Sequence, residues 1–159
     1  MPKISAGLLM YRIRNKCLEV FIVHPGGPFW KDKDIGAWSI PKGEVEEGEG
    51  LLERAKKELE EETGIKPPFS DESFIYLGEV KQKSGKIVHA WAFEGDWNGF
   101  LMRQSFTEIE YPKGSGKKVK IPEVDKAAFF NSEEAKLKLN PAQAEFIDRL
   151  KNLLEKNKK

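Results

Sequence analysis

The chain has 159 residues, of which 39% are hydrophobic and 33% are charged, and this length and composition suit one domain with one hydrophobic core. Its 27 basic side chains against 26 acidic ones exclude a general electrostatic attraction to nucleic acid or to an anionic membrane, so any anion site must be local. The single cysteine, Cys17, excludes an intramolecular disulfide framework and fits a reducing compartment.

The first residues, 1–16, hold only a short apolar run before Arg12. This run is too short for a secretory signal, and no stretch of the sequence approaches a membrane span. We therefore expect a cytoplasmic protein with no membrane partner, as a monomer or a homodimer.

Two strands are predicted to open the chain. Residues 4–11 and 18–24 are rich in β-branched and aromatic side chains and are separated by a polar stretch, which predicts a strand pair joined by a turn. A long loop at 25–36 and a short strand at 37–40 are expected to follow.

A helix is predicted from about residue 50 to about residue 63. Leu52, Ala55 and Leu59 recur at helical spacing and predict one apolar face. Gly64 is well placed as the left-handed residue that follows the last turn, and the prolines at 67–68 prevent continuation.

The second half of the chain is predicted to return to strands. Residues 74–82 and 87–95 flank Lys-Ser-Gly-Lys, which favours a hairpin, and residues 105–130 indicate a strand, an exposed turn and a return to the core. A last helix is expected to begin with Asn140 as its cap and Pro141 in its first position. The whole pattern predicts a domain with a mixed sheet and at least two helices.

Acidic side chains gather on the first predicted helix. Glu58, Glu61 and Glu62 stand at i, i+3 and i+4, so they share one face with Cβ atoms about 5–6 Å apart. Like charges this close repel, and a hard divalent cation would turn that repulsion into coordination. The alternative is a solvated face on which Lys56 and Lys57 pair with acids four residues further on, and the helix alone leaves both interpretations open.

The spacing around this helix favours the metal site. Residues 43–65 read Gly, five residues, Glu, seven residues, Lys-Glu-Leu, one residue, Glu-Glu, one residue, Gly-Ile. This resembles the signature of the Nudix hydrolases, Gly-x5-Glu-x7-Arg-Glu-aliphatic-x-Glu-Glu-x-Gly-aliphatic, and eight of its nine specified positions match. The departure is Lys57, because lysine keeps the charge of the family's arginine but loses the planar fork with which that arginine orients a catalytic glutamate.

The resemblance implies an α+β fold, a Nudix-type α/β/α sandwich in which helices flank a mixed β-sheet, as a single domain over residues 1–159. It also implies a site for Mg²⁺ or Mn²⁺. The positions that match metal ligands of the family are Gly43 (through its carbonyl), Glu58, Glu61 and Glu62.

The resemblance implies roles for other residues of the signature as well. Glu61 is the first candidate for the general base and Glu58 the second. Glu49 and Lys57 match positions that support the ligand helix.

Two candidate residues lie outside the signature. Residues 38–43, Trp-Ser-Ile-Pro-Lys-Gly, look like the approach to the signature in the dinucleoside polyphosphate hydrolases, which implies that Lys42 contacts phosphate; the alternative is a surface lysine in a turn. Many Nudix proteins have an acidic residue near the position of Glu123 that joins the metal site or acts as base, with Asp125 as the neighbouring candidate here. The alternative for Glu123 is an exposed loop residue.

Aromatic side chains near the signature are candidates for a surface on which a nucleobase stacks, namely Phe29, Trp30 and Trp38. The alternative for each is simple packing. His24 and His89 have no second His or Cys spaced for a zinc site, and the basic run at 113–120 is interpreted as a solvated turn.

These features predict a Mg²⁺-dependent pyrophosphohydrolase that cleaves a phosphoanhydride bond in a nucleoside diphosphate linked to another group. A dinucleoside polyphosphate or a nucleoside triphosphate is the preferred substrate, and no DNA partner is implied. The alternative is a nucleotide- or RNA-binding module without turnover.

Overall fold

The computed structural model describes residues 3–97, 99 and 106–156. The strands are β1 (Ile4–Arg14), β2 (Cys17–Pro25), β3 (Lys42–Glu44), β4 (Ile75–Lys81), β5 (Ile87–Glu94), β6 (Phe106–Glu110), β7 (Lys118–Pro122) and β8 (Val124–Asn131). The helices are α1 (Leu51–Thr63), α2 (Ser132–Lys138) and α3 (Ala144–Lys156), with one short 3₁₀ turn at Asp71–Ser73.

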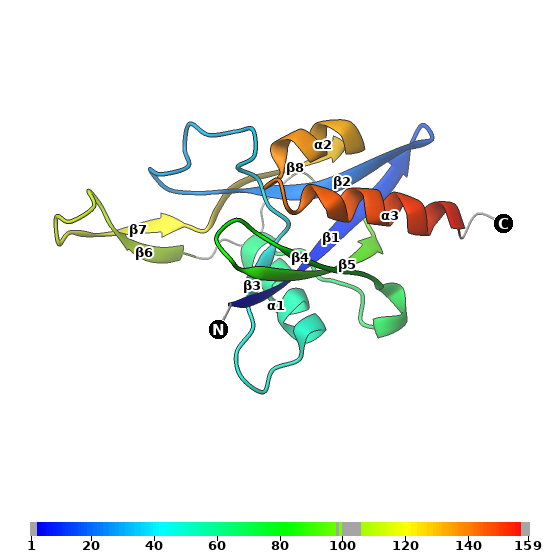
Figure 1. The fold of residues 1–159 in the computed structure, drawn as a ribbon, viewed down its shortest axis with the longest axis horizontal. Coiled ribbons are helices and arrows are strands. Elements are labelled where there is room, and N and C mark those ends of the chain that lie inside the picture. The colour runs from blue at the N-terminus through cyan, green and yellow to red at the C-terminus, as the bar shows by residue number, and fades with distance from the viewer. Residues whose placement is uncertain (1–2, 98, 100–105, 157–159) are drawn as a thin grey trace.

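The main sheet is mixed. Its strand order is β4-β5-β1-β2-β8, with β3 paired to β1. Strands β1 and β5 run parallel, whereas the other neighbouring strands are antiparallel. Strands β6 and β7 form a separate hairpin that projects from one end of the molecule (Figure 1).

Two hydrophobic clusters lie on opposite faces of this sheet. Leu9 and Tyr11 of β1 belong to the cluster that includes the buried side chains of α3, whereas Leu8 and Met10 belong to the cluster that includes Ala55 and Leu59 of α1. This alternation follows from the two-residue period of a strand, which sends neighbouring side chains to opposite faces. The predicted α+β sandwich, with a mixed sheet between helices, is confirmed.

Helix α1 has the predicted bounds and the predicted end. Gly64 adopts a left-handed conformation at φ 81°, and its N–H donates to the Glu60 carbonyl at 2.8 Å. Glycine stabilises such a turn because it has no Cβ to strain it.

Two other predictions differ from the structure, and one helix was not predicted. Residues 37–40 form only isolated bridges, Ser39 with Val23 and Trp38 with Leu139. Helix α3 begins at Ala144, because the Asn140 carbonyl first accepts a turn hydrogen bond from the Gln143 N–H at 2.9 Å. Helix α2 is short and was not expected from the sequence.

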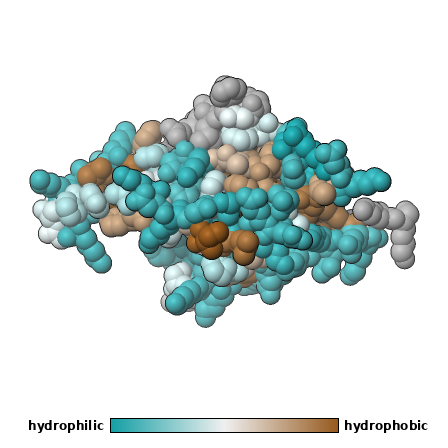
Figure 2. Space-filling model, turned by 90° about the horizontal axis from the view of Figure 1, so that it is seen from above, coloured by the Kyte–Doolittle hydropathy of each residue, from teal (hydrophilic) through white to brown (hydrophobic). Residues whose placement is uncertain are grey.

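The end of the molecule that carries β6 and β7 exposes hydrophobic side chains. Figure 2 shows brown and pale atoms there among the teal surface. The exposed residues include Phe29, Phe106, Tyr111 and Val119. Among the described residues, no helix is long and apolar enough to cross a membrane.

Candidate metal centre

Helix α1 places its acidic residues beside its buried face. Ala55 and Leu59 are fully buried against the sheet, so the adjacent helix positions lie where the core meets the surrounding loops. Glu58 is half-buried there, and Glu62 is only 6% exposed. Packing of the apolar stripe therefore forces two carboxylates out of bulk water.

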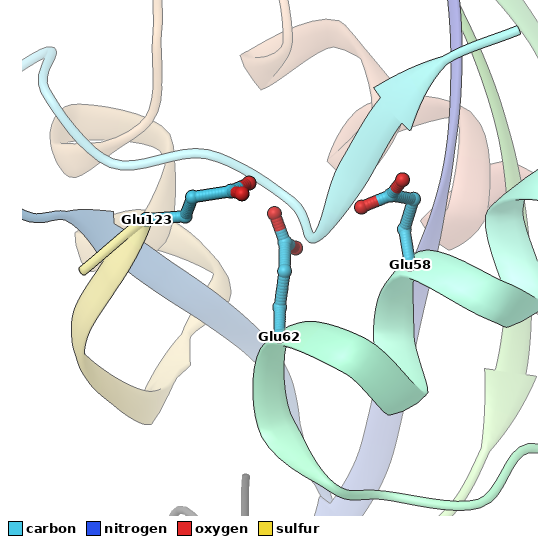
Figure 3. Close-up of side chains that lie close together, drawn as sticks. All are labelled: Glu58, Glu62 and Glu123. Atoms are coloured by element: carbon cyan, nitrogen blue, oxygen red, sulfur yellow. The ribbon is translucent and has the colours of Figure 1, made fainter. Parts of the chain in front are cut away.

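A third carboxylate joins them from the other end of the fold. Glu123 occupies the bend between β7 and β8, and Figure 3 shows its side chain directed toward those of Glu58 and Glu62. One oxygen of each residue lies within 4.8 Å of the others. Residues separated by more than sixty positions in the sequence thus converge on one point.

Burial and mutual repulsion both act on these groups. Burial, followed by the charges of Glu58 and Glu123, raises the pKa of Glu62 well above its ordinary value, although Lys42 opposes this. Burial also raises the pKa of Glu58. Among the described residues, Glu62 Oε2 is buried without a hydrogen-bond partner.

The donor set fits a hard divalent cation. A buried polar atom without a partner costs about 1–3 kcal/mol, and desolvated like charges add to that cost. Carboxylate oxygens are the ligands that Mg²⁺ and Mn²⁺ prefer. A bound cation would compensate both the repulsion and the missing hydrogen bond of Glu62.

Strand β3 supplies a lysine and a glycine to the same place. Burial, followed by the charge of Lys86, lowers the pKa of the half-buried Lys42, against the opposing charges of Glu62, Glu44 and Glu58. A Cβ on Gly43 would collide with the Glu58 carboxylate. Glycine at this position therefore allows β3 and α1 to approach each other around that side chain.

An arginine that was not singled out from the sequence binds two glutamates of the signature. Arg54 donates two hydrogen bonds to Glu49, from Nε to Oε1 at 2.8 Å and from Nη2 to Oε2 at 2.7 Å, and a third from Nη1 to Glu58 Oε1 at 2.9 Å. The i, i+4 spacing of Arg54 and Glu58 is visible in the sequence. The contact with Glu49 cannot be read from the sequence, because it depends on the shape of the loop before α1.

The remaining residues of the signature lie around this centre. Glu61 is half-buried and outside the convergent trio, yet its charge contributes to raising the pKa of Glu58, behind burial. Lys57 is exposed and forms no hydrogen bond or ion pair within the part of the chain that the structure describes. Lys56 pairs with Asp71 at 2.7 Å, not with the helix acid expected for a purely solvated face.

The aromatic candidates separate into two groups. Phe29 and Trp30 are 45% and 40% exposed, and Phe29 lies edge-on to Tyr111 with ring centroids 5.6 Å apart. Trp38 is only 4% exposed, and its indole N–H donates to Asp34 at 2.7 Å. Trp38 therefore packs in the core, and we omit it from the residues proposed to stack on a base.

The neighbour of Glu123 has a different partner. Asp125 Oδ1 lies 2.8 Å from Nδ1 of the fully buried His24, whose Nε2 lies 2.6 Å from the Lys33 carbonyl oxygen. This chain of contacts ties the start of β8 to the loop at 25–36. Asp125 thus faces the histidine, and Glu123 faces the carboxylates.

Comparisons with known proteins identify the family to which the chain is similar. A family model described as the NUDIX domain matches residues 1–150. Nudix hydrolase 6 of Arabidopsis thaliana is 42% identical over 64 residues, which are 40% of this chain and 22% of that protein. An RNA pyrophosphohydrolase of Erythrobacter litoralis is 46% identical over 39 residues, 24% of this chain and 24% of that protein. Each match spans less than a quarter of the relative's length.

The fold resembles solved structures over nearly the whole chain. A crystal structure of a C. elegans Ap4A hydrolase binary complex superimposes with a TM-score of 0.65 and covers 96% of this chain and 98% of that one. The two sequences are 18% identical, so this likeness concerns the fold.

Proposed function

The chain belongs to the NUDIX domain family, and on that premise we propose that it is a divalent-metal-dependent pyrophosphohydrolase that cleaves a phosphoanhydride bond. One observation carries the proposal: three carboxylates converge, and the buried Oε2 of Glu62 lacks a hydrogen-bond partner among the described residues. Such an arrangement destabilises the fold by itself, and a bound cation compensates it. We also propose that residues 1–159 form one domain of this type.

The cation would be Mg²⁺ or Mn²⁺. The proposed ligands are Glu58, Glu62 and Glu123, together with Glu61 and the Gly43 carbonyl. When bound, the cation supplies Lewis acidity, which neutralises charge on phosphate oxygens and acidifies a coordinated water.

Lys42 is proposed to bind the substrate's phosphates. Its half-buried ammonium lies close enough to Glu58 and Glu62 for their charges to act on its pKa. A phosphate group beside these carboxylates would therefore meet Lys42 without requiring the lysine to move far. This contact would hold the phosphate chain in line for attack.

A carboxylate of α1 is proposed to take the proton of the attacking water. Glu58 is engaged by Arg54 and belongs to the convergent trio. The Glu61 side chain makes no hydrogen bond with any residue that the structure describes, and Glu61 stands one helical turn from Glu58. We therefore propose Glu61 as the general base, with Glu58 as the second candidate.

The substrate is proposed to be a nucleoside diphosphate linked to another group, with a dinucleoside polyphosphate or a nucleoside triphosphate first. The fold's similarity to an Ap4A hydrolase supports a dinucleoside polyphosphate. The match to an RNA pyrophosphohydrolase makes 5′-triphosphorylated RNA a further candidate substrate. The exposed rings of Phe29 and Trp30 are proposed to stack on a base, because every base offers a π-face.

A hydrolysis screen tests this function. Wild type is incubated with Mg²⁺ or Mn²⁺ and diadenosine polyphosphates, nucleoside triphosphates, ADP-ribose, NADH, diphosphoinositol phosphates or 5′-triphosphorylated RNA, and products are separated by chromatography. Glu62→Gln is run beside it, with Glu145→Gln as a control on α3. We expect at least one compound to be cleaved by the wild type and the control only.

Two results would contradict the proposal. Equal turnover in wild type and Glu62→Gln would show that the carboxylate site takes no part in the reaction. Tight nucleotide binding without turnover of any compound would instead support a binding module.

A further inference from the structure

Arg54 links the loop before α1 to the middle of that helix. Its guanidinium binds both oxygens of Glu49, in the loop before α1, and one oxygen of Glu58, in the middle of α1. The three side chains are 13%, 18% and 12% exposed. The pair with Glu49 is forked, and the contact with Glu58 is a single hydrogen bond. All three are part-buried hydrogen bonds between charged groups, which are stronger and more directional than exposed ion pairs.

The electrostatics agree with a rigid arrangement. The hydrogen bonds with Glu49 are the largest cause that raises the pKa of Arg54, and the same contact lowers the pKa of Glu49. Glu49 Oε1 also accepts the Glu46 N–H at 3.1 Å. The guanidinium is thus anchored to a loop that is itself tied down, and it presents its remaining N–H groups to Glu58.

Strand β3 confines Glu58 as well. The space in which Gly43 would carry a Cβ is occupied by the Glu58 carboxylate. The side chain therefore contacts the guanidinium of Arg54 and lies against the backbone of β3. Figure 3 shows the carboxylate of Glu58 near those of Glu62 and Glu123. A carboxylate held in this way does not need to be ordered again when a cation binds.

In this chain, the residue at the arginine position of the Nudix signature does not bind Glu58. Lys57 is exposed, and within the described residues its ammonium has no hydrogen-bond partner. An ammonium also lacks the planar fork that a guanidinium offers to a carboxylate. The fork in this chain comes from Arg54, three residues earlier on α1.

We propose that Arg54 is a positioning residue of the metal centre, which orients Glu58 through the Glu49–Arg54–Glu58 bridge in place of an arginine at position 57. The inference rests on the proposed function, because it assumes that Glu58 is a ligand. It assigns a role to a residue outside the specified positions of the signature, and it accounts for the lysine within them.

The test measures cation binding separately from catalysis. Mn²⁺ affinity is measured by calorimetry without substrate for wild type, Arg54→Ala, Arg54→Lys and the double variant Arg54→Ala/Lys57→Arg. Arg149→Ala is the matched control, because Arg149 is also a helix arginine that binds a glutamate four residues away, Glu145, at 2.7 Å. Circular dichroism and thermal melts verify the fold, and kcat and KM are measured on whichever compound the wild type cleaves.

We expect Arg54→Ala to weaken Mn²⁺ binding and to lower kcat by about 10- to 100-fold, the usual cost of removing a partner behind a metal ligand. KM is expected to change much less. Arg54→Lys keeps the charge but not the fork, and we expect it to fold and to show an intermediate loss. The double variant is expected to recover part of the affinity, and Arg149→Ala to match wild type.

The outcomes separate this inference from the function on which it rests. Wild-type affinity in both Arg54→Ala and Arg54→Lys, in a protein that binds Mn²⁺, would overturn the role of Arg54 alone. No Mn²⁺ binding by the wild type would overturn the metal centre, and the role of Arg54 with it. A loss of affinity in both Arg54→Ala and Arg54→Lys, with partial recovery in Arg54→Ala/Lys57→Arg relative to Arg54→Ala, would support the inference even if no substrate is found.

Discussion

Helices α1 and α3 have the same length, thirteen residues, and each carries two lysines and one arginine, but α1 has five acidic residues and α3 has three, and the acids lie in different surroundings. On α3, Glu145 pairs with Arg149 and Asp148 pairs with Lys136 of α2, and these acids stay exposed. On α1, Glu58 and Glu62 are withdrawn from water and directed at a third carboxylate. The two helices therefore differ both in the number of their acids and in the burial of those acids.

The physical costs of the two helices differ accordingly. Exposed, paired acids change stability little. Buried carboxylates that repel one another destabilise the fold until something positive binds them. Under the proposed function, the buried acids of α1 bind a cation, whereas the acids of α3 serve only solvation and pairing.

The largest expected effect is on the packing helix. Phe146 of α3 is fully buried against the sheet, and Phe146→Ala is expected to lower the free energy of unfolding by about 3–5 kcal/mol. Mn²⁺ affinity measured well below the melting temperature should stay at the wild-type value. A large loss of affinity in protein that is still folded would show that the two faces of the sheet are not independent.

A smaller backbone change is expected to act on the ligand helix instead. Gly43→Ala places a methyl group where the Glu58 carboxylate lies, so that side chain or β3 must move. Since a misplacement of 1 Å in an active site can cost about 100-fold, we expect turnover to fall by roughly that factor, with a smaller change in the melting temperature. Unchanged steady-state kinetics would mean that the orientation of Glu58 does not matter.

The smallest effect is expected at the position where this chain departs from the signature. Lys57→Arg is expected to preserve or modestly raise turnover, because the carboxylates already have Arg54 as their forked partner. The measurement is kcat beside wild type on one substrate. A clear decrease would show that the exposed Lys57 has a role of its own.

Much of this contrast can be predicted from the sequence, and part of it cannot. The spacing of Leu52, Ala55 and Leu59 and the glycine at 64 predicted α1 because helix period and the left-handed end are local properties. Local spacing likewise places Glu58 and Glu62 on one face.

Other features depend on long-range packing. Glu123 lies near Glu58 and Glu62 only because β7 and β8 bring it there, and the sequence does not show where these strands run. The burial of Trp38 requires strands and helices far away in the sequence, including Phe130, whose ring lies 5.1 Å from it. The bond between Arg54 and Glu49 requires the shape of one loop. Local spacing predicts the class of site, and tertiary packing determines which side chains meet in it.

The most direct test of the central claim is the melting temperature of wild type and Glu62→Gln, each measured with chelator and with millimolar Mn²⁺, and with Glu145→Gln as the α3 control. A ligand that binds only the native state stabilises it in proportion to the logarithm of its concentration over Kd. We predict that Mn²⁺ stabilises wild type and Glu145→Gln but not Glu62→Gln, and that in chelator Glu62→Gln melts at or above the wild-type temperature because a repelling buried charge is gone. Equal Mn²⁺ stabilisation of all three proteins, or none in any of them, would contradict a metal centre built on Glu62.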